Sequence, residues 1–204
     1  TDLAMEAHAL CRETGASQLQ GVIASEETLN GFPLTRVEIV DKAAEQALGK
    51  PRGVYLTLDI TRFWRHEADS FQQAVESIAE LLAPMLPAEG PVLVAGLGNQ
   101  AMTPDALGPG CLSHLLITRH LKSVLPDFRE TAALSGGVVG TTGLEAAEWV
   151  RGAAEHMGPE AVIVVDALAA RGLDRLCNTI QISDTGLVPG SGVGNHRMAL
   201  NRET

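Results

Sequence analysis

Basic residues, cysteines and aromatic residues are all scarce in this chain of 204 residues, and each scarcity excludes a class of protein. Only 15 Lys and Arg stand against 25 Asp and Glu, and the formal net charge of −10 disfavours generic DNA or RNA binding, because an acidic chain repels phosphates. The three cysteines lie far apart without a CxxC pair, which argues against a disulfide scaffold or a zinc ribbon. With aromatic residues at only 3%, the core must be built from Val, Leu, Ile and Ala.

Long apolar runs are also missing. No stretch is apolar for long enough to cross a bilayer, and the N-terminal segment TDLAMEAHAL lacks the basic and then apolar pattern of a secretion signal. We therefore expect a cytoplasmic protein without membrane contacts. We expect residues 1–204 to form a single α/β catalytic domain that is truncated at its C-terminus, since the final segment SGVGNHRMALNRET does not resemble a domain end.

Apolar and amphipathic segments alternate along the chain in a pattern typical of βαβ units. The predicted strands are 34–40, 53–60, 91–98, 161–167 and 179–184, and the predicted helices are 42–48, 71–86, 104–121, 143–157 and 167–176. This order indicates a mostly parallel sheet with helices on both faces. The runs PVLVAGLG and AVIVVDA are apolar throughout, so we expect these two strands side by side in the middle of the sheet.

Two helix starts and one helix face can be predicted in more detail. Asp41 is the expected N-cap of the helix at 42–48, and Ser70 with Gln73 forms an expected capping box before the helix at 71–86. The apolar residues of that second helix recur at helical spacing and predict its buried face: Phe71, Val75, Ile78 and Leu82.

Two acids follow the two most apolar strands. Asp105 lies in GLGNQAMTPDALGPG after the strand at 91–98, and Asp166 closes the strand at 161–167. Ligands of parallel sheets bind beyond the carboxyl ends of the strands, and carboxyl groups that share a site push their pKa values apart. Such a pair can supply an acid and a base that activate water against an amide. The alternative is that both are capping residues, Asp105 in a first helical turn and Asp166 before the next helix.

Three other motifs compete with this pair. Gly96, Gly98 and Ala101 match the G-x-G-x-x-A dinucleotide fingerprint, although Pro104 places the helix start later than that motif requires. The tripeptide Asp184–Gly186 spells the DTG of pepsin-like proteases but ends a strand of an alternating α/β chain, where a structural turn is the simpler interpretation. The segment GSGVGN at 190–195 is either a flexible loop or a set of backbone N–H groups that hold an anion or oxyanion.

Six stretches of this sequence resemble the germination protease family, in order and over nearly the whole chain. They are Thr1–Ala4, Gly96–Asn99, Thr103–Pro109, Asp166–Arg171, Gln181–Gly186 and Pro189–Asn195. The resemblance implies an αβα sandwich of the phosphorylase/hydrolase type, related in fold to hydrogenase-maturation endopeptidases. It also implies an aspartic-type endopeptidase whose two acids map onto Asp105 and Asp166.

The same resemblance implies a biological role. The family degrades small acid-soluble spore proteins during germination, is made as a self-processing zymogen and forms a homotetramer, which places the protein in the spore core. Thr1–Ala4 looks like the sequence that the family cuts, so Asp2–Leu3 is the expected self-cleavage bond. The alternative is a capped helix start, with Thr1 or Asp2 as the N-cap. Gly98, Asn99, Gly192 and Gly194 are the expected substrate-binding or oxyanion residues.

No cofactor is expected, and no metal, because no histidine stands in a motif that matches the metal-binding relatives. Three alternatives stay open. The first is a metal-dependent maturation endopeptidase, and the second is a nucleotide- or nucleoside-handling enzyme that uses the turn at Gly96–Gly98. The third is an assembly domain without catalytic activity.

Overall fold

The computed structural model describes residues 1–13, 20–191, 194 and 197–202, and the chain forms two compact units. The first unit comprises residues 1–85 and 168–185, and the second comprises residues 86–167 and 186–204. Within the described ranges, no helix combines the length and the apolar character needed to cross a bilayer.

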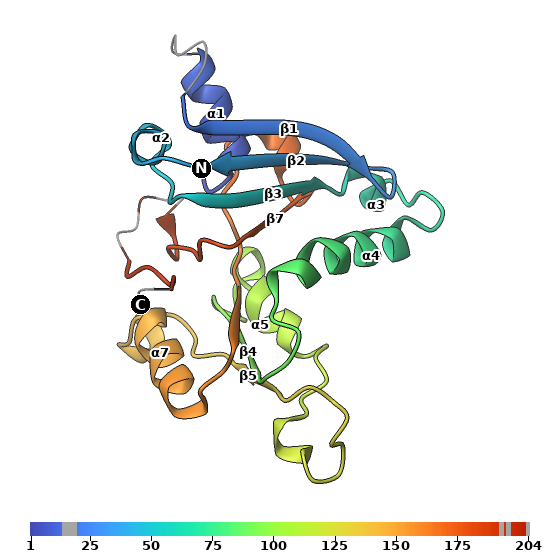
Figure 1. Cartoon of the computed structure of the whole chain (residues 1–204), viewed down its shortest axis with the longest axis vertical. Coiled ribbons are helices and arrows are strands. Elements are labelled where there is room, and N and C mark those ends of the chain that lie inside the picture. The colour runs from blue at the N-terminus through green and yellow to red at the C-terminus, as the bar shows by residue number, and fades with distance from the viewer. Residues whose placement is uncertain (14–19, 192–193, 195–196, 203–204) are drawn as a thin grey trace. The chain divides into compact units, whose positions relative to one another are not determined.

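The first unit is built on an antiparallel sheet with the order β1-β2-β3-β7 (Figure 1). Its strands are β1 (Val22–Leu29), β2 (Phe32–Ile39), β3 (Gly53–Asp59) and β7 (Thr179–Ser183). Asn30 and Gly31 alone connect β1 to β2, and both have a positive φ, 48° and 84°. An Asn-Gly pair favours this two-residue hairpin turn because both positions tolerate left-handed backbone.

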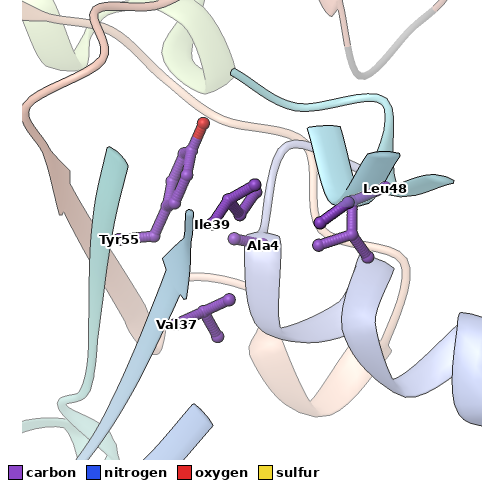
Figure 2. Packing of buried hydrophobic residues seen from close by; sticks show 6 residues of the cluster. Ala4, Val37, Ile39, Leu48 and Tyr55 are labelled. Atoms are coloured by element: carbon purple, nitrogen blue, oxygen red, sulfur yellow. The ribbon is translucent and has the colours of Figure 1, made fainter. Parts of the chain in front are cut away.

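Helices cover both faces of this sheet. On one face, α1 (Ala4–Glu13) and α2 (Lys42–Leu48) pack against β2 and β3, and Figure 2 shows this cluster of Ala4, Val37, Ile39, Leu48 and Tyr55. On the other face, α4 (Ser70–Leu82) packs against the opposite side chains of the same strands. That second cluster consists of Phe32, Leu34, Leu56, Leu58 and Ala74. The remaining elements are α3 (Thr61–Trp64), η1 (Ala83–Met85) and η4 (Leu173–Arg175).

The predicted cap of α2 is confirmed, the predicted start of α4 is wrong, and its predicted face is wrong at Phe71 and Val75 but confirmed at Ile78, which packs against the core. Asp41 Oδ1 accepts the backbone N–H of Ala44 at 2.8 Å. The N-cap of α4 is Asp69, with a φ of 60° and no side-chain cap bond. Ser70 and Ala74 face the core, whereas Phe71 is 64% exposed. Ile78 and Leu81 also pack against this cluster, whereas Phe71 and Val75 lie outside it.

The second unit contains a parallel sheet with the order β5-β4-β6. Its strands are β4 (Val92–Gly96), β5 (Thr131–Leu134) and β6 (Ala161–Val165). Every residue of β4 is buried, so its central position is confirmed, as is its parallel pairing with β6. The prediction that β6 also lies in the middle is wrong for the described residues, because β6 is an edge strand and Val162 is 39% exposed.

The main helix of the second unit is α7 (Ala146–Met157), which packs against β4. Glu145 and Glu148 form a capping box at its start, and Gly158 ends it in the left-handed conformation. The bridge between Leu187 and Leu200 closes the same core. The shorter helices are α5 (Leu107–Leu112), α6 (Val139–Thr142), η2 (Thr103–Asp105) and η3 (Arg119–Leu121).

The predicted α/β class is confirmed, but the strands form two sheets instead of one mostly parallel sheet. The long helix predicted at 104–121 is also wrong: η2, α5 and η3 form there instead, and Gly108, Pro109 and Gly110 lie within α5. The helix predicted at 167–176 is reduced to η4. The three-layer αβα sandwich and the single catalytic domain stay predictions.

Candidate active site

Asp166 lies directly after the last residue of β6 that pairs with β4. The backbone N–H of Leu97 donates to the carbonyl oxygen of Val165 at 2.8 Å, which extends the ladder one step beyond the strands. Asp166 follows directly, is half-buried, and accepts the backbone N–H of Ala167 through Oδ1 at 2.9 Å. Its carboxyl group therefore leaves the chain at the carboxyl end of the parallel sheet, where such sheets bind ligands.

Asp105 is held against the turn that follows β4. Its Oδ2 accepts the backbone N–H of Asn99 at 2.8 Å, and its own N–H donates to the carbonyl oxygen of Met102 at 2.8 Å. Gly98 has a φ of 112°, and a Cβ built there would overlap the carbonyl oxygen of Asp105 and lie 3.0 Å from its Oδ1. Glycine is therefore required for both the backbone conformation and the close approach.

A second glycine brings α5 against the ends of β4 and β6. A Cβ at Gly108 would lie 2.5 Å from both the backbone nitrogen of Leu97 and the carbonyl oxygen of Val165. A Cβ at Gly96 would lie 2.6 Å from the carbonyl carbon of Gly108, so the two glycines pack backbone to backbone. Together with the Asn99–Asp105 bond, these contacts bring Asp105 and Asp166 to the same edge of the sheet.

Helix capping does not account for Asp166, whereas Asp105 does lie in the first turn of a short helix, as the alternative predicts. The helix that Asp166 was expected to cap does not form, since residues 167–172 are not helical. Asp105 lies in η2, and its carboxylate accepts an N–H from the preceding turn, at Asn99. Both acids are only partly buried. Two such carboxyl groups at one sheet edge can act as a general acid and a general base.

The glycine motif GLGN serves internal packing. Gly96 contacts Gly108 and Gly98 contacts Asp105, and α5 begins at Leu107, well after the glycines. A dinucleotide fingerprint instead opens its helix within the glycines, so that the helix N-terminus meets the phosphates. The nucleotide alternative therefore has no geometric support at this turn.

The four residues predicted to bind substrate or an oxyanion do not lie in one place in the described part of the chain. The N–H of Asn99 is already donated to Asp105, and Asn99 Oδ1 accepts the N–H of Ala101 at 3.0 Å. Gly194 lies in an exposed turn and donates its N–H to the carbonyl oxygen of Ser191 at 3.1 Å. Gly192 lies outside the described residues. An oxyanion or substrate role for these residues and for Gly98 stays a prediction.

The DTG motif is a structural turn. Asp184 Oδ1 accepts the backbone N–H of Val54 at 2.8 Å, and the Asp184 N–H donates to the Val54 carbonyl oxygen at 3.4 Å. Asp184 therefore prolongs the pairing of β3 with β7 in the first unit. A Cβ at Gly53 would lie 2.5 Å from Asp184 Oδ1, so this end of the sheet is closely packed.

Asp184→Asn is therefore expected to leave peptide cleavage within about twofold of the unmodified protein, because Asn keeps an oxygen that accepts the Val54 N–H. Asp184→Ala removes this acceptor and should lower the free energy of unfolding by about 1–2 kcal/mol. Initial cleavage rates and urea unfolding of both variants test this. A loss of activity in folded Asp184→Asn would instead make this acid catalytic.

Asp2 and Leu3, the predicted self-cleavage site, lie in the first unit at the start of α1. Leu3 is fully buried, and the N–H of Asp2 donates to the carbonyl oxygen of Ala169 at 2.9 Å. Among the residues that the structure describes, no group of three or more His, Cys, Asp or Glu side chains is arranged to hold a metal ion.

An α/β chain with two acids at the carboxyl edge of a parallel sheet has the framework of a hydrolase. The family model described as germination protease matches residues 1–204, and the chain belongs to this family of peptidases. It is 42% identical to the germination protease of Caldanaerobacter subterraneus subsp. tengcongensis, with 100% of this chain and 64% of the relative aligned.

Two further relatives carry the same name. The germination protease of Clostridium perfringens (strain ATCC 13124) is 40% identical, with 100% of this chain and 65% of the relative aligned. That of Bacillus cereus (strain G9842) is 44% identical, with 100% and 59% aligned. The chain therefore spans less than two thirds of the length of these relatives.

Proposed function

We propose that this chain is the catalytic part of an endopeptidase that degrades small acid-soluble spore proteins during germination, with Asp105 and Asp166 as its catalytic acids. The observation that carries this proposal is the position of both acids where β4 and β6 end side by side. Membership of the germination protease family supports the peptidase class and the spore-protein substrate.

In the proposed mechanism, one acid is ionised and the other is protonated. Asp105 takes the role of the base in this proposal, and Asp166 takes the role of the acid. Asp105 removes a proton from water, and the oxygen attacks the peptide carbonyl carbon while Asp166 donates its proton to the carbonyl oxygen. As the tetrahedral intermediate collapses, the former carbonyl oxygen returns its proton to Asp166, the C–N bond breaks, and the leaving nitrogen takes the proton that Asp105 removed from water.

The proposal also covers the location, assembly and processing of the protein. We place it in the spore core, in the cytoplasm, as a homotetramer that is made as a zymogen and cuts its own N-terminal segment at Asp2–Leu3. The acid–leucine–alanine order of Thr1–Ala4 supports this bond as the processing site.

Matured protein is expected to begin at Leu3, because hydrolysis of the Asp2–Leu3 amide leaves Leu3 with the new α-amino group. Intact mass spectrometry of a precursor that is extended before Thr1, recorded over time, measures this directly. The same precursor with Asp105→Asn should keep its original mass. A different new terminus would reject Asp2–Leu3 as the processed bond.

The function is tested by incubating the complete protein with a peptide from a small acid-soluble spore protein, with and without Asp105→Asn. Cleavage that is lost in the variant and unchanged by a chelator is the expected result. Loss of activity in chelator would favour the metal-dependent maturation type of endopeptidase. Unchanged cleavage by a folded Asp105→Asn variant would reject the proposed mechanism.

A further inference from the structure

The backbone of Ala169 holds Asp2 at two points. The N–H of Asp2 donates to the carbonyl oxygen of Ala169 at 2.9 Å, and the N–H of Ala169 donates to Asp2 Oδ2 at 2.8 Å. One residue of the first unit thus recognises both the main chain and the carboxylate of Asp2. The second bond is charge-assisted and is stronger for aspartate than for a neutral side chain.

The side-chain amide of Gln181 recognises the same segment from β7. Its Nε2 donates to the carbonyl oxygen of Asp2 at 3.1 Å, and its Oε1 accepts the N–H of Ala4 at 2.9 Å. The amide therefore brackets Leu3 with one donor and one acceptor, as a neighbouring strand would. This contact is made to main-chain groups, so it does not depend on the side chains of the segment.

The surroundings add selectivity for side chains. Leu3 and Ala4 are both 0% exposed, so the positions after the aspartate accept an apolar residue and then a small one. The carboxylate and the main-chain N–H and carbonyl groups of Asp2 are the features that a separate peptide would present, whereas Leu3 and Ala4 stay in the folded chain.

We propose that Ala169 and Gln181 form a peptide-binding site whose ligand is an aspartate-bearing segment, and that Thr1–Asp2 occupies it as a covalently attached ligand. The proposal rests on the proposed self-cleavage for one step only. In that step water hydrolyses the Asp2–Leu3 amide. Asp2 then carries an α-carboxylate, and Leu3 carries an α-ammonium group. Three hydrogen bonds to Asp2 then hold a separate, exchangeable peptide that ends in Thr-Asp.

The processed chain, which begins at Leu3, provides the direct test, with Asp105→Asn added so that no turnover occurs. Titration with acetyl-Thr-Asp should shift the NMR signals of the Ala169 amide and the Gln181 side-chain amide. The change should saturate with a Kd on the order of 1 mM, as suits a small ligand. Acetyl-Thr-Asn should bind about tenfold more weakly, because the charge-assisted bond is lost.

Gln181→Glu is the matched protein variant. Its carboxylate can still accept the N–H of Ala4 but cannot donate to the ligand carbonyl, so binding of acetyl-Thr-Asp should weaken about tenfold or more. Gln72→Glu, on the exposed face of α4, changes the same chemical group away from the site and should leave binding unchanged.

Hydrogen exchange in the unprocessed chain gives a second measurement that does not require the shortened protein. Asp2→Ala should speed exchange of the Ala169 amide about tenfold or more. The amides of Arg171 and Gly172 should stay protected, because they donate to Glu6 at 2.8 and 2.9 Å.

Two results would overturn the binding site: no saturable shift in a folded processed chain, or equal affinity for acetyl-Thr-Asp and acetyl-Thr-Asn. If the processed chain does not fold, the Asp2→Ala variant of the unprocessed chain decides: an unchanged rate of hydrogen exchange at the Ala169 amide would also overturn the binding site. Failure of self-cleavage is seen separately, as the absence of a Leu3 terminus, and it leaves the peptide titration valid.

Discussion

Asp105→Asn and Asp166→Asn should each lower cleavage of a spore-protein peptide by about a hundredfold or more, with the fold retained. Asn has nearly the shape of Asp but cannot exchange a proton with water or with the peptide carbonyl. At position 105 an amide oxygen can still accept the N–H of Asn99, and at position 166 it can accept the N–H of Ala167. Stability should therefore change far less than activity.

The comparison requires kcat and KM for each variant together with its urea unfolding curve. We expect the loss in kcat, because an acid or base acts on the transition state more than on substrate binding. The double variant should be little worse than the worse single variant, since the two acids act as a unit. Asp127→Asn is the matched control, an exposed acid of the second unit. Either catalytic variant cleaving at near wild-type rate while folded would reduce that acid to a structural role.

The edge of the sheet that carries these acids could be predicted from sequence because the signal is local. Continuous apolar runs predict buried strands, and an acid placed just after each run predicts its position at the carboxyl edge. The role of Gly108 could not be predicted in this way. Gly96 and Gly108 are twelve residues apart, and their close backbone packing depends on the position of β6 beside them, which the sequence does not reveal.

The hairpin of β1 and β2 was missed although its signal is strong. Asn30–Gly31 stands between two apolar and polar alternating segments, which is the most specific short signal for a two-residue turn. Recognising it would have predicted an antiparallel sheet in the first unit. The pairing of β7 with β3 joins segments more than a hundred residues apart, and no local pattern contains that information.

The face of α4 shows where periodicity misleads. Phe71 and Val75 have the helical spacing of a buried face, yet they are 64% and 45% exposed. Phe71 instead lies beside Phe63, with ring centroids 5.9 Å apart, and Ser70 and Ser77 face the core. Packing distance decided this orientation: small side chains permit a close approach of helix and sheet, and apolar spacing alone does not encode that distance.

Gly108→Ala should destabilise the second unit by about 3 kcal/mol, the upper end of the usual cost of overpacking. Its methyl group would lie 2.5 Å from the backbone of both Leu97 and Val165, and backbone atoms cannot move aside as a flexible side chain can. Relief requires α5 to shift away from the two strand ends, which also displaces the turn that holds Asp105. Residual folded protein should therefore be less active than its folded fraction predicts.

Gly110→Ala, two residues further along α5, is the matched control, because a Cβ there meets nothing within 4 Å. Alanine is a better helix former than glycine, so this variant should be neutral or more stable by up to about 1 kcal/mol. Urea unfolding of both variants, followed by circular dichroism, measures the difference directly. Equal midpoints and equal slopes for the two would mean that α5 does not approach the ends of β4 and β6 as closely as Gly108 permits. The contacts that bring Asp105 and Asp166 to one edge of the sheet would then lose their physical basis.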